Sequence, residues 1–377
     1  MNFQKIKNKI ENTKETKKTY GKVHRISEFM IVSKGPMASI GQMCEVGENK
    51  ILCEVVGLKG NNVELMPMEK DVQIYIDDEV YIKNETVKIT SMEKMLGRII
   101  NAKGEFIDGG YEYEKKFEIK YKNKAPNSMQ RERITKPMVT KVKAIDSLLT
   151  IGEGQRIGIF AGSGVGKTTL LSMIAENAEA DINVIALIGE RGREVKEFIE
   201  ENLGEEGMKK SIIIVSTSDE HKLMNIKAAE LATSVAEHYR EKGLKVILMM
   251  DSITRYAMAK REIDLATGSL APNGKTPTME SSIQTLLERA GNDQNGSITG
   301  IYTVLVEGDD MDGTIPDMVR GILDGHIVLD RKLANKNHFP AINVLASKSR
   351  VMDFIVTEEH NNLARDVNKN LMKLVLI

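Results

Sequence analysis

The chain of 377 residues has no tryptophan, and only 5% of its residues are aromatic. It has two cysteines, Cys44 and Cys53, and neither lies near a histidine cluster. This pattern argues against a disulfide framework or a zinc site and favours a reducing compartment. No apolar run approaches the ~20 residues that span a bilayer, and the N-terminus lacks the apolar core of a secretory signal. We expect the protein to stay in the cytoplasm.

Net charge is nearly absent as well, because 53 Lys and Arg residues balance 54 Asp and Glu residues to a net −1. Such a balance gives no overall attraction for nucleic acid or an anionic membrane. The hydrophobic fraction of 41% and the charged fraction of 28% are ordinary for a globular protein. The length favours two or three domains.

The first segment, residues 1–20, is rich in lysine and carries Phe3, Ile6 and Ile10 at helical spacing. It is either a short amphipathic partner-binding segment or a frayed terminus. Residues 21–95 then show short alternating apolar runs separated by turn signals, such as "KILCEVVGL" followed by "GNN". This texture predicts a small all-β domain, a sandwich or barrel.

Residues 96–135 are charged and rich in glycine with little periodicity, and we interpret them as a connecting segment. In residues 136–352, apolar runs such as "RIGIF" and "KVILMMD" alternate with helical patterns, including 194–203 and 225–242. Strands that are apolar on both faces and separated by helices predict a mainly parallel sheet in an α/β domain. Residues 353–377 form a short final helical segment.

The strongest chemical signal is "RIGIFAGSGVGKTTLL", in which an apolar strand leads through a glycine-rich loop into a helix. In such a loop, backbone N–H groups and the helix N-terminus bind phosphate oxygens. Lys167 is predicted to contact the β- and γ-phosphates, and the Thr168 hydroxyl to ligate Mg²⁺. The predicted ATP-binding residues are Gly162, Ser163, Gly164, Val165, Gly166, Lys167, Thr168 and Thr169.

Two carboxylates follow buried strands. Asp251 ends "KVILMMD", at the strand edge where nucleotides bind open α/β sheets. It is a candidate to hold Mg²⁺ through water, and the alternative is that it caps the next helix. Glu190 in "LIGERGREV" is a candidate to polarise the attacking water. A charged loop after a strand is often simply solvated, so spacing alone leaves both interpretations of Glu190 open.

Five stretches together resemble the flagellar and type III secretion export ATPases (FliI/YscN-like), relatives of the rotary ATP synthase subunits. They are "GIFAGSGVGKTTLL", "LIGERGREVKEFI", "MMDSITRYAMAKREI", "LVEGDDM" and "ILDGHIVLDRKLANKNHFPAINVLASKSRVM". The resemblance runs from about Val23 to Met352. It implies a RecA-like P-loop ATPase core behind an N-terminal β-barrel.

The resemblance also implies roles for single residues. Glu190 matches the family's catalytic glutamate, and Arg191 and Arg255 match arginines on the γ-phosphate side. Arg350 matches the arginine that reaches into the neighbouring subunit's site. Phe339 matches the aromatic residue that stacks on adenine. From the residues alone, the alternative interpretations are a surface helix residue for Arg255 and an ordinary core aromatic for Phe339.

Because one chain carries the loop lysine, Glu190 and Arg350, a head-to-tail ring of identical chains would complete its own sites. The family implies a homohexamer with ATP and Mg²⁺ as cofactors. Its partners would be the stalk and regulator proteins of an export apparatus, secreted substrates and their chaperones. The expected location is the cytoplasmic face of the membrane, with peripheral association only.

Three departures from the family pattern stand out. The chain stops at Ile377, where relatives continue into a helical domain that forms one side of the adenine pocket, so we expect an open pocket. The loop "GSLAPNGKTPTM" carries Lys275 where an aromatic is expected, and "TKVKAID" replaces the usual "TGVRAID". Whether the chain is a fragment or a reduced paralogue stays open.

Three other functions compete with an export ATPase. A rotary ion-translocating subunit would need a dedicated unlike partner. A hexameric nucleic-acid translocase would need a basic, aromatic-rich small domain, whereas residues 40–90 are more acidic than basic and carry only Tyr75 and Tyr81. A non-hydrolysing scaffold conflicts with the full set of candidate catalytic residues.

Overall fold

The computed structural model describes residues 20–27, 30–83, 86–111, 113–114 and 117–375. The chain divides into two compact units, Met1–Glu85 and Thr86–Ile377. The predicted amphipathic segment with Phe3, Ile6 and Ile10 lies outside the described residues. Each unit has its own hydrophobic core and is described separately below.

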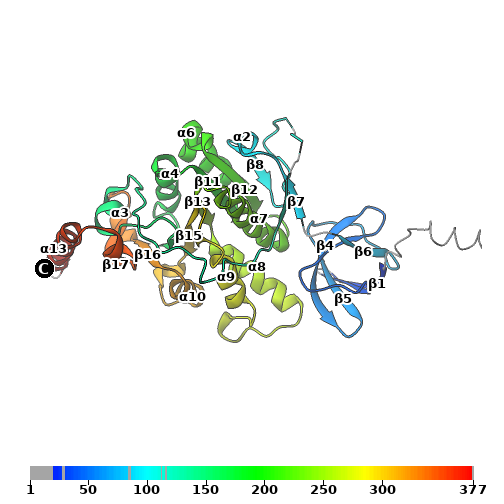
Figure 1. Ribbon diagram of the computed structural model, residues 1–377. Helices are drawn as coiled ribbons and strands as arrows, with labels where there is room; N and C mark the ends of the chain where they lie inside the picture. The colour runs from blue at the N-terminus through cyan, green and yellow to red at the C-terminus, as the bar shows by residue number, and fades with distance from the viewer. Residues whose placement is uncertain (1–19, 28–29, 84–85, 112, 115–116, 376–377) are drawn as a thin grey trace, which may run out of the picture. The chain divides into compact units, whose positions relative to one another are not determined.

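The first unit is a closed six-stranded barrel in the order β1-β2-β5-β4-β3-β6, which closes where β1 pairs with β6 (Figure 1). Alternate residues point inward and form a core that includes Val23, Val55, Leu65 and Val80. Its strands are β1 (Tyr20–Ile26), β2 (Ile31–Lys34), β3 (Met43–Val46), β4 (Ile51–Lys59), β5 (Asn62–Pro67) and β6 (Glu79–Lys83). The predicted N-terminal barrel is therefore confirmed.

The two cysteines face each other inside this barrel. Cys44 on β3 is the cross-strand partner of Cys53 on β4, and both side chains are fully buried free thiols. Burial raises the pKa of Cys44 to about 12 and raises the pKa of Cys53 further. Both thiols therefore serve as small hydrophobic core residues.

The second unit is built on a mainly parallel sheet, as predicted, in the order β17-β16-β10-β15-β13-β11-β12-β8. Only β17 and the short β14 run antiparallel to their neighbours in the described part of this sheet. The strands are β8 (Ile99–Asn101), β10 (Arg156–Ala161), β11 (Ile182–Glu190), β12 (Ser211–Thr217), β13 (Lys245–Asp251), β14 (Gly291–Asn292), β15 (Ser297–Leu305), β16 (Gly325–Leu329) and β17 (Ile342–Ser349).

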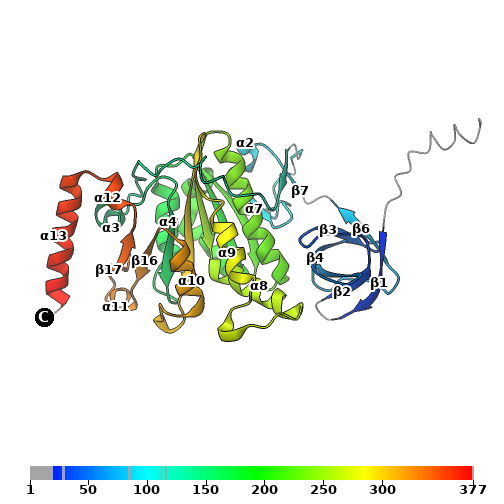
Figure 2. The same ribbon diagram turned by 60° about the horizontal axis from the view of Figure 1, so that its bottom comes forward.

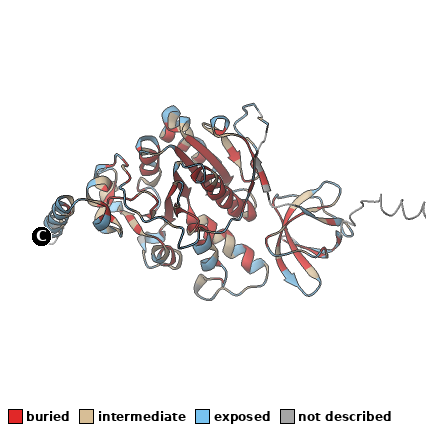
Figure 3. Ribbon diagram, in the orientation of Figure 1, coloured by how far each residue is buried: buried red, intermediate tan, exposed pale blue. Residues whose placement is uncertain are grey.

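Helices cover both faces of the sheet (Figures 1 and 2). Ile185 and Leu187 of β11 pack in one core with Leu170, Leu171 and Ile174 of α4. The intervening residues of β11 are also buried, on the face against which α7 packs. The central strands are therefore buried along almost their whole length (Figure 3).

The helices of the second unit follow the predicted alternation. They are α2 (Met92–Met95), α3 (Lys143–Leu148), α4 (Lys167–Asn177), α5 (Gly192–Glu197), α6 (Gly204–Lys209), α7 (Lys222–Arg240), α8 (Ile253–Ala266), α9 (Met279–Leu287), α10 (Thr314–Ile322), α11 (Arg331–Ala334), α12 (Met352–Ile355) and α13 (Glu358–Val375), with the short 3-10 helices η2 (Pro272–Gly274) and η3 (Glu307–Asp309). The predicted helix 194–203 is α5 followed by a π-helical turn, η1 (Phe198–Leu203).

The segment between barrel and sheet has more structure than its sequence indicates. β8 adds an edge strand to the large sheet, and β9 (Phe117–Lys120) pairs with β7 (Thr86–Ile89). The contact boundary after Glu85 leaves β7 and α2 with the second unit rather than with the barrel. None of the helices in the described ranges is both long and apolar enough to cross a membrane.

Candidate active site

The candidate site lies where the parallel strands β10, β11, β13 and β15 reach their carboxyl ends. A cavity of about 580 Å³ opens there. Its lining includes Gly162, Ser163, Gly164, Gly166, Lys167, Thr168, Thr169, Gly189, Glu190, Arg191, Glu194, Ser218, Asp251, Arg255 and Leu305. Because carboxyl ends of parallel strands share one edge of a sheet, residues far apart in sequence converge at this point.

The phosphate-binding loop joins β10 to α4, as predicted from the sequence. Gly164 and Gly166 have φ values of +76° and +91°, conformations that glycine adopts without strain. Val165 is 1% exposed and anchors the loop in the core. The N-terminus of α4, beginning at Lys167, therefore faces the cavity with its free backbone N–H groups.

Lys167 and Asp251 form the centre of the site. The Lys167 Nζ donates to the Asp251 Oδ1 at 2.7 Å, and the Thr303 hydroxyl donates to the same oxygen at 2.7 Å. Burial lowers the pKa of Lys167, but the carboxylates of Asp251 and Glu190 outweigh it and leave this pKa raised. Lys167 therefore carries its charge at neutral pH.

Asp251 is free to act in the site because another residue caps the helix that follows. The Ser252 side chain accepts from the Arg255 N–H at the start of α8. The alternative that Asp251 is a helix cap is therefore wrong. Thr303, its second partner, was missed because a single threonine in the apolar run of β15 carries no signal of what it contacts.

Glu190 ends β11 and lies 3.9 Å from the Lys167 Nζ through its Oε1. Burial and then the Asp251 carboxylate raise the pKa of Glu190 to about 7, against the opposing charge of Lys167. A hydrogen bond with Glu194 contributes to this rise in the pKa. A carboxylate with a pKa near neutrality is suited to accept a proton.

A local irregularity sets the direction of the Glu190 side chain. Gly189 has a φ of +67°, and the register between β11 and β12 shifts between Ile188 and Glu190. Such a bulge changes the side to which the next residue points. The side chain of Arg255 packs directly over Gly189, with three of its carbons within 3.3 Å of where a Cβ would be.

The two arginines assigned to the phosphate side differ in their environment. Arg255 lies on α8 beside Gly189 and lines the cavity, so it is not simply a surface helix residue. The Arg191 side chain is 76% exposed at the cavity rim, where it forms an ion pair with Glu194 at 3.8 Å.

The segment before β17 contacts the phosphate-binding loop from another side. A Cβ on Gly166 would come within 3.3 Å of the Phe339 ring, which is itself 54% exposed. Phe339 is therefore not a core aromatic. The Arg331 guanidinium donates to the Ser163 carbonyl at 3.0 Å, a contact that sequence reasoning missed because charged residues are common in such loops.

Arg350 lies outside the cavity, near the amino ends of the parallel strands, whereas the cavity lies at their carboxyl ends. It directly follows β17, which runs antiparallel to β16, and Ser349 pairs with Gly325 at the amino end of β16. The Arg350 N–H donates to the Asp324 carbonyl, and its exposed guanidinium donates to the Arg320 carbonyl at 3.3 Å. The structure thus brings the other predicted catalytic residues together and separates Arg350 from them.

Comparisons with known proteins identify the family of the chain. The profile of the ATP synthase alpha/beta family, nucleotide-binding domain, matches residues 141–349. The chain is 50% identical over 370 residues to the flagellum-specific ATP synthase of Bacillus subtilis, covering 97% of this chain and 84% of that protein. It is 43% identical over 346 residues to the SPI-2 type 3 secretion system ATPase of Salmonella typhimurium, covering 92% and 80%.

A solved structure gives the same result. The assembled ATPase EscN from the enteropathogenic E. coli type III secretion system matches with a TM-score of 0.86 and 43% identity, covering 93% of this chain and 86% of that chain. Fold, nucleotide-binding domain and relatives therefore place the chain in the family of ATPases that serve flagellar and type III secretion export systems.

Proposed function

We propose that this chain hydrolyses Mg-ATP at the described cavity and that a ring of identical chains uses the energy to release chaperones and unfold substrates for export. One observation carries the catalytic part. Lys167, Asp251 and Glu190 come from three separate elements and meet at one cavity within ion-pair distance of the lysine. A structural salt bridge alone would not need a second buried carboxylate with a raised pKa beside it.

The residues fit a magnesium–nucleotide complex. Gly164 and Gly166 hold backbone conformations that let the loop wrap phosphates closely, and the N-terminus of α4 supplies free donors. Thr168 and Asp251 are the oxygen ligands available to the metal. When bound, Mg²⁺ neutralises charge on the transferring phosphate. In the described structure Lys167 pairs with Asp251, and we expect phosphate oxygens to replace that carboxylate as its partner.

Glu190 is assigned to the attacking water. Phosphoryl transfer depends on an oriented nucleophile, and a carboxylate must be ionised to accept its proton. Arg255 lies beside the glutamate and supplies positive charge toward the phosphates. Phe339 offers a half-exposed ring beside the phosphate-binding loop for stacking on adenine.

Arg350 is assigned to the neighbouring subunit's site. The Arg350 N–H donates to Asp324, and the Asp324 N–H donates to Arg156, the first residue of β10. The phosphate-binding loop instead follows Ala161, the last residue of β10. From Arg156 to Ala161, five residues of rise along β10 separate the two ends of the strand by about 17 Å. This distance is more than an arginine side chain spans. Arg350 is therefore too far away to serve its own loop, and a head-to-tail ring supplies the site it can reach.

The relatives support the remaining partners. EscN has been solved as an assembled ATPase and in complex with its central stalk EscO, and the second structure matches this chain with a TM-score of 0.85 and 42% identity over 95% of its length. We propose a homohexameric ring that binds a stalk protein, chaperones and substrates at the cytoplasmic face of the membrane.

Two substitutions test the catalytic assignment. Lys167→Ala removes the phosphate-facing cation, so Mg-ATP binding should weaken. Glu190→Gln preserves shape and removes the base, so binding should persist while turnover falls by on the order of 10²-fold or more. Equilibrium nucleotide binding and steady-state phosphate release measure the two effects. Wild-type turnover in the Glu190→Gln chain would refute the assignment of Glu190.

A further inference from the structure

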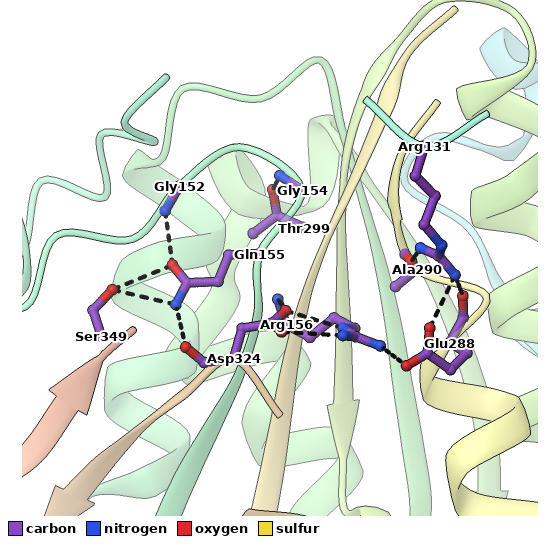
Figure 4. A network of polar contacts seen from close by, with 10 residues as sticks. All are labelled: Arg131, Gly152, Gly154, Gln155, Arg156, Glu288, Ala290, Thr299, Asp324 and Ser349. Carbon is purple, nitrogen blue, oxygen red and sulfur yellow. Dashed lines mark hydrogen bonds and ion pairs between the residues drawn. The ribbon is translucent and has the colours of Figure 1, made fainter. Parts of the chain in front are cut away.

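A polar network holds the backbone of Arg350 near the amino ends of the parallel strands. The Arg350 N–H donates to the Asp324 carbonyl at 3.0 Å. The Asp324 carboxylate in turn accepts from the backbone N–H, Nε and Nη2 of Arg156, each at 3.0 Å (Figure 4). Two-point recognition by a guanidinium fixes the orientation of a carboxylate as well as its position.

Gln155 joins this network from inside the protein. Its side chain is fully buried, and its Nε2 donates to the Asp324 carbonyl at 3.0 Å and to the Ser349 hydroxyl at 3.2 Å (Figure 4). Its Oε1 accepts from the Gly152 N–H at 2.9 Å. Both groups to which Gln155 donates adjoin Arg350, because Asp324 binds the Arg350 N–H and Ser349 directly precedes it.

The backbone contacts matter because the side chain of Arg350 has little support of its own. Its guanidinium is exposed, and its hydrogen bond to the Arg320 carbonyl is long at 3.3 Å. The position that the charge reaches in a neighbouring chain therefore depends on how firmly residues 349 and 350 are held. A misplacement of about 1 Å in a catalytic group can cost about a hundredfold in rate.

We propose that Gln155 is a positioning residue for Arg350 and acts on the neighbouring subunit's reaction. This inference rests on the proposed function, in which Arg350 serves that neighbouring site. Gln155 lies before β10, at the edge of the sheet opposite its own phosphate-binding loop. A substitution of Gln155 should therefore lower ATP turnover when it is in the chain that donates the arginine. It should have no effect when it is in the chain that binds the nucleotide.

Mixed rings separate these two roles. A Lys167→Ala chain can only donate its arginine, and an Arg350→Ala chain can only offer its nucleotide site. We would place Gln155→Met, which keeps side-chain length and removes the amide, first in the donating chain and then in the nucleotide-binding chain. ATP turnover and KM of each mixture are compared at equal, confirmed co-assembly.

With Gln155→Met in the donating chain, kcat should fall about tenfold to a hundredfold with KM unchanged. In the nucleotide-binding chain the same substitution should leave the restored activity as it was. Equal loss in both arrangements, or none in either, would overturn the inference. If the parent mixture without Gln155→Met shows no rescue, the trans role of Arg350 fails, which is a separate result.

A milder variant and a control guard against misfolding. Ser349→Ala removes the hydroxyl that Gln155 binds and should lower kcat in the same arrangement, by less than Gln155→Met. Asn183→Leu removes another buried amide, which donates to the Ala175 carbonyl at 2.7 Å. Asn183 is on β11 and does not belong to the network around β17. This substitution should show no preference for the donating chain. A preference equal to that of Gln155→Met would also overturn the inference.

Discussion

Single charges set the chemistry of the site. Lys167 lies between two carboxylates, 2.7 Å from Asp251 and 3.9 Å from Glu190, so one cation neutralises part of each. Asp251 receives a second hydrogen bond, from the Thr303 hydroxyl. Burial and the Asp251 carboxylate raise the pKa of Glu190. The proposed roles follow this difference, with Asp251 holding the metal ion and Glu190 accepting the proton.

The pH dependence of turnover should report this difference. Burial and Asp251 raise the pKa of Glu190 to about 7, and only its ionised form accepts a proton. Activity that needs this form is therefore gained as pH rises through about 7 and lost as pH falls below it. A kcat/KM profile reports the free enzyme's value. A flat profile within about one unit either side of neutrality would contradict the assignment.

The sequence predicts these charges better than their partners. Lys167, Glu190 and Asp251 each follow a recognisable apolar strand, and parallel strands end at one edge, so their convergence is foreseeable. Thr303 and Arg331 were missed because their partners, Asp251 and Ser163, lie 52 and 168 residues away in the sequence and leave no local pattern. The register shift at Gly189 is likewise invisible, because a glycine after a strand fits many turns.

At the scale of elements, the bulge at the end of β11 connects the fold to catalysis. Gly189 holds a positive φ of +67° while Arg255 packs on its α-carbon. A side chain at this position would be strained and would also displace Arg255. Glu190 and Arg255 are therefore positioned together by one glycine.

Gly189→Ala should impair turnover more than nucleotide binding. The left-handed backbone costs about 1–2 kcal/mol of unfolding free energy, and displacement of Glu190 should lower kcat more than about tenfold. Gly243→Ala is the matched control. Gly243 lies in the turn after α7 with a φ of +87°, and a Cβ there would lie 3.6 Å from the Asn295 carbonyl oxygen. Similar denaturation midpoints with lower kcat in Gly189→Ala alone would support the role of the bulge.

Element boundaries show where sequence patterns lose information. The helix predicted at 194–203 keeps its apolar face, yet its second half is a π-turn, and a stretch this short does not distinguish i→i+5 from i→i+4 hydrogen bonding by its apolar pattern. β8 was assigned to a connecting segment because three residues are too few to show alternation. Its pairing with β12 depends on the sheet already being present.

At the scale of the whole molecule, the proposed role of Arg350 would make each active site a property of two chains. Arg350→Ala alone should cost on the order of 10³-fold in turnover, the low end for an arginine of this kind. Mixing it with Lys167→Ala should restore activity, because about a quarter of interfaces in randomly mixed rings pair an intact loop with an intact arginine. Absence of rescue in rings shown to contain both chains would contradict action in trans.

The buried cysteine pair has a practical consequence for experiments on this protein. Cys44 and Cys53 are the only thiols in the sequence, and both lie in the barrel core. Since the thiolate is the reactive species, thiol reagents should modify the native chain slowly. The rate of labelling therefore reports how often the barrel opens and does not depend on opening of the second unit. An engineered surface cysteine in the second unit would react at once, so fluorescent labels can be attached there without first removing the natural cysteines.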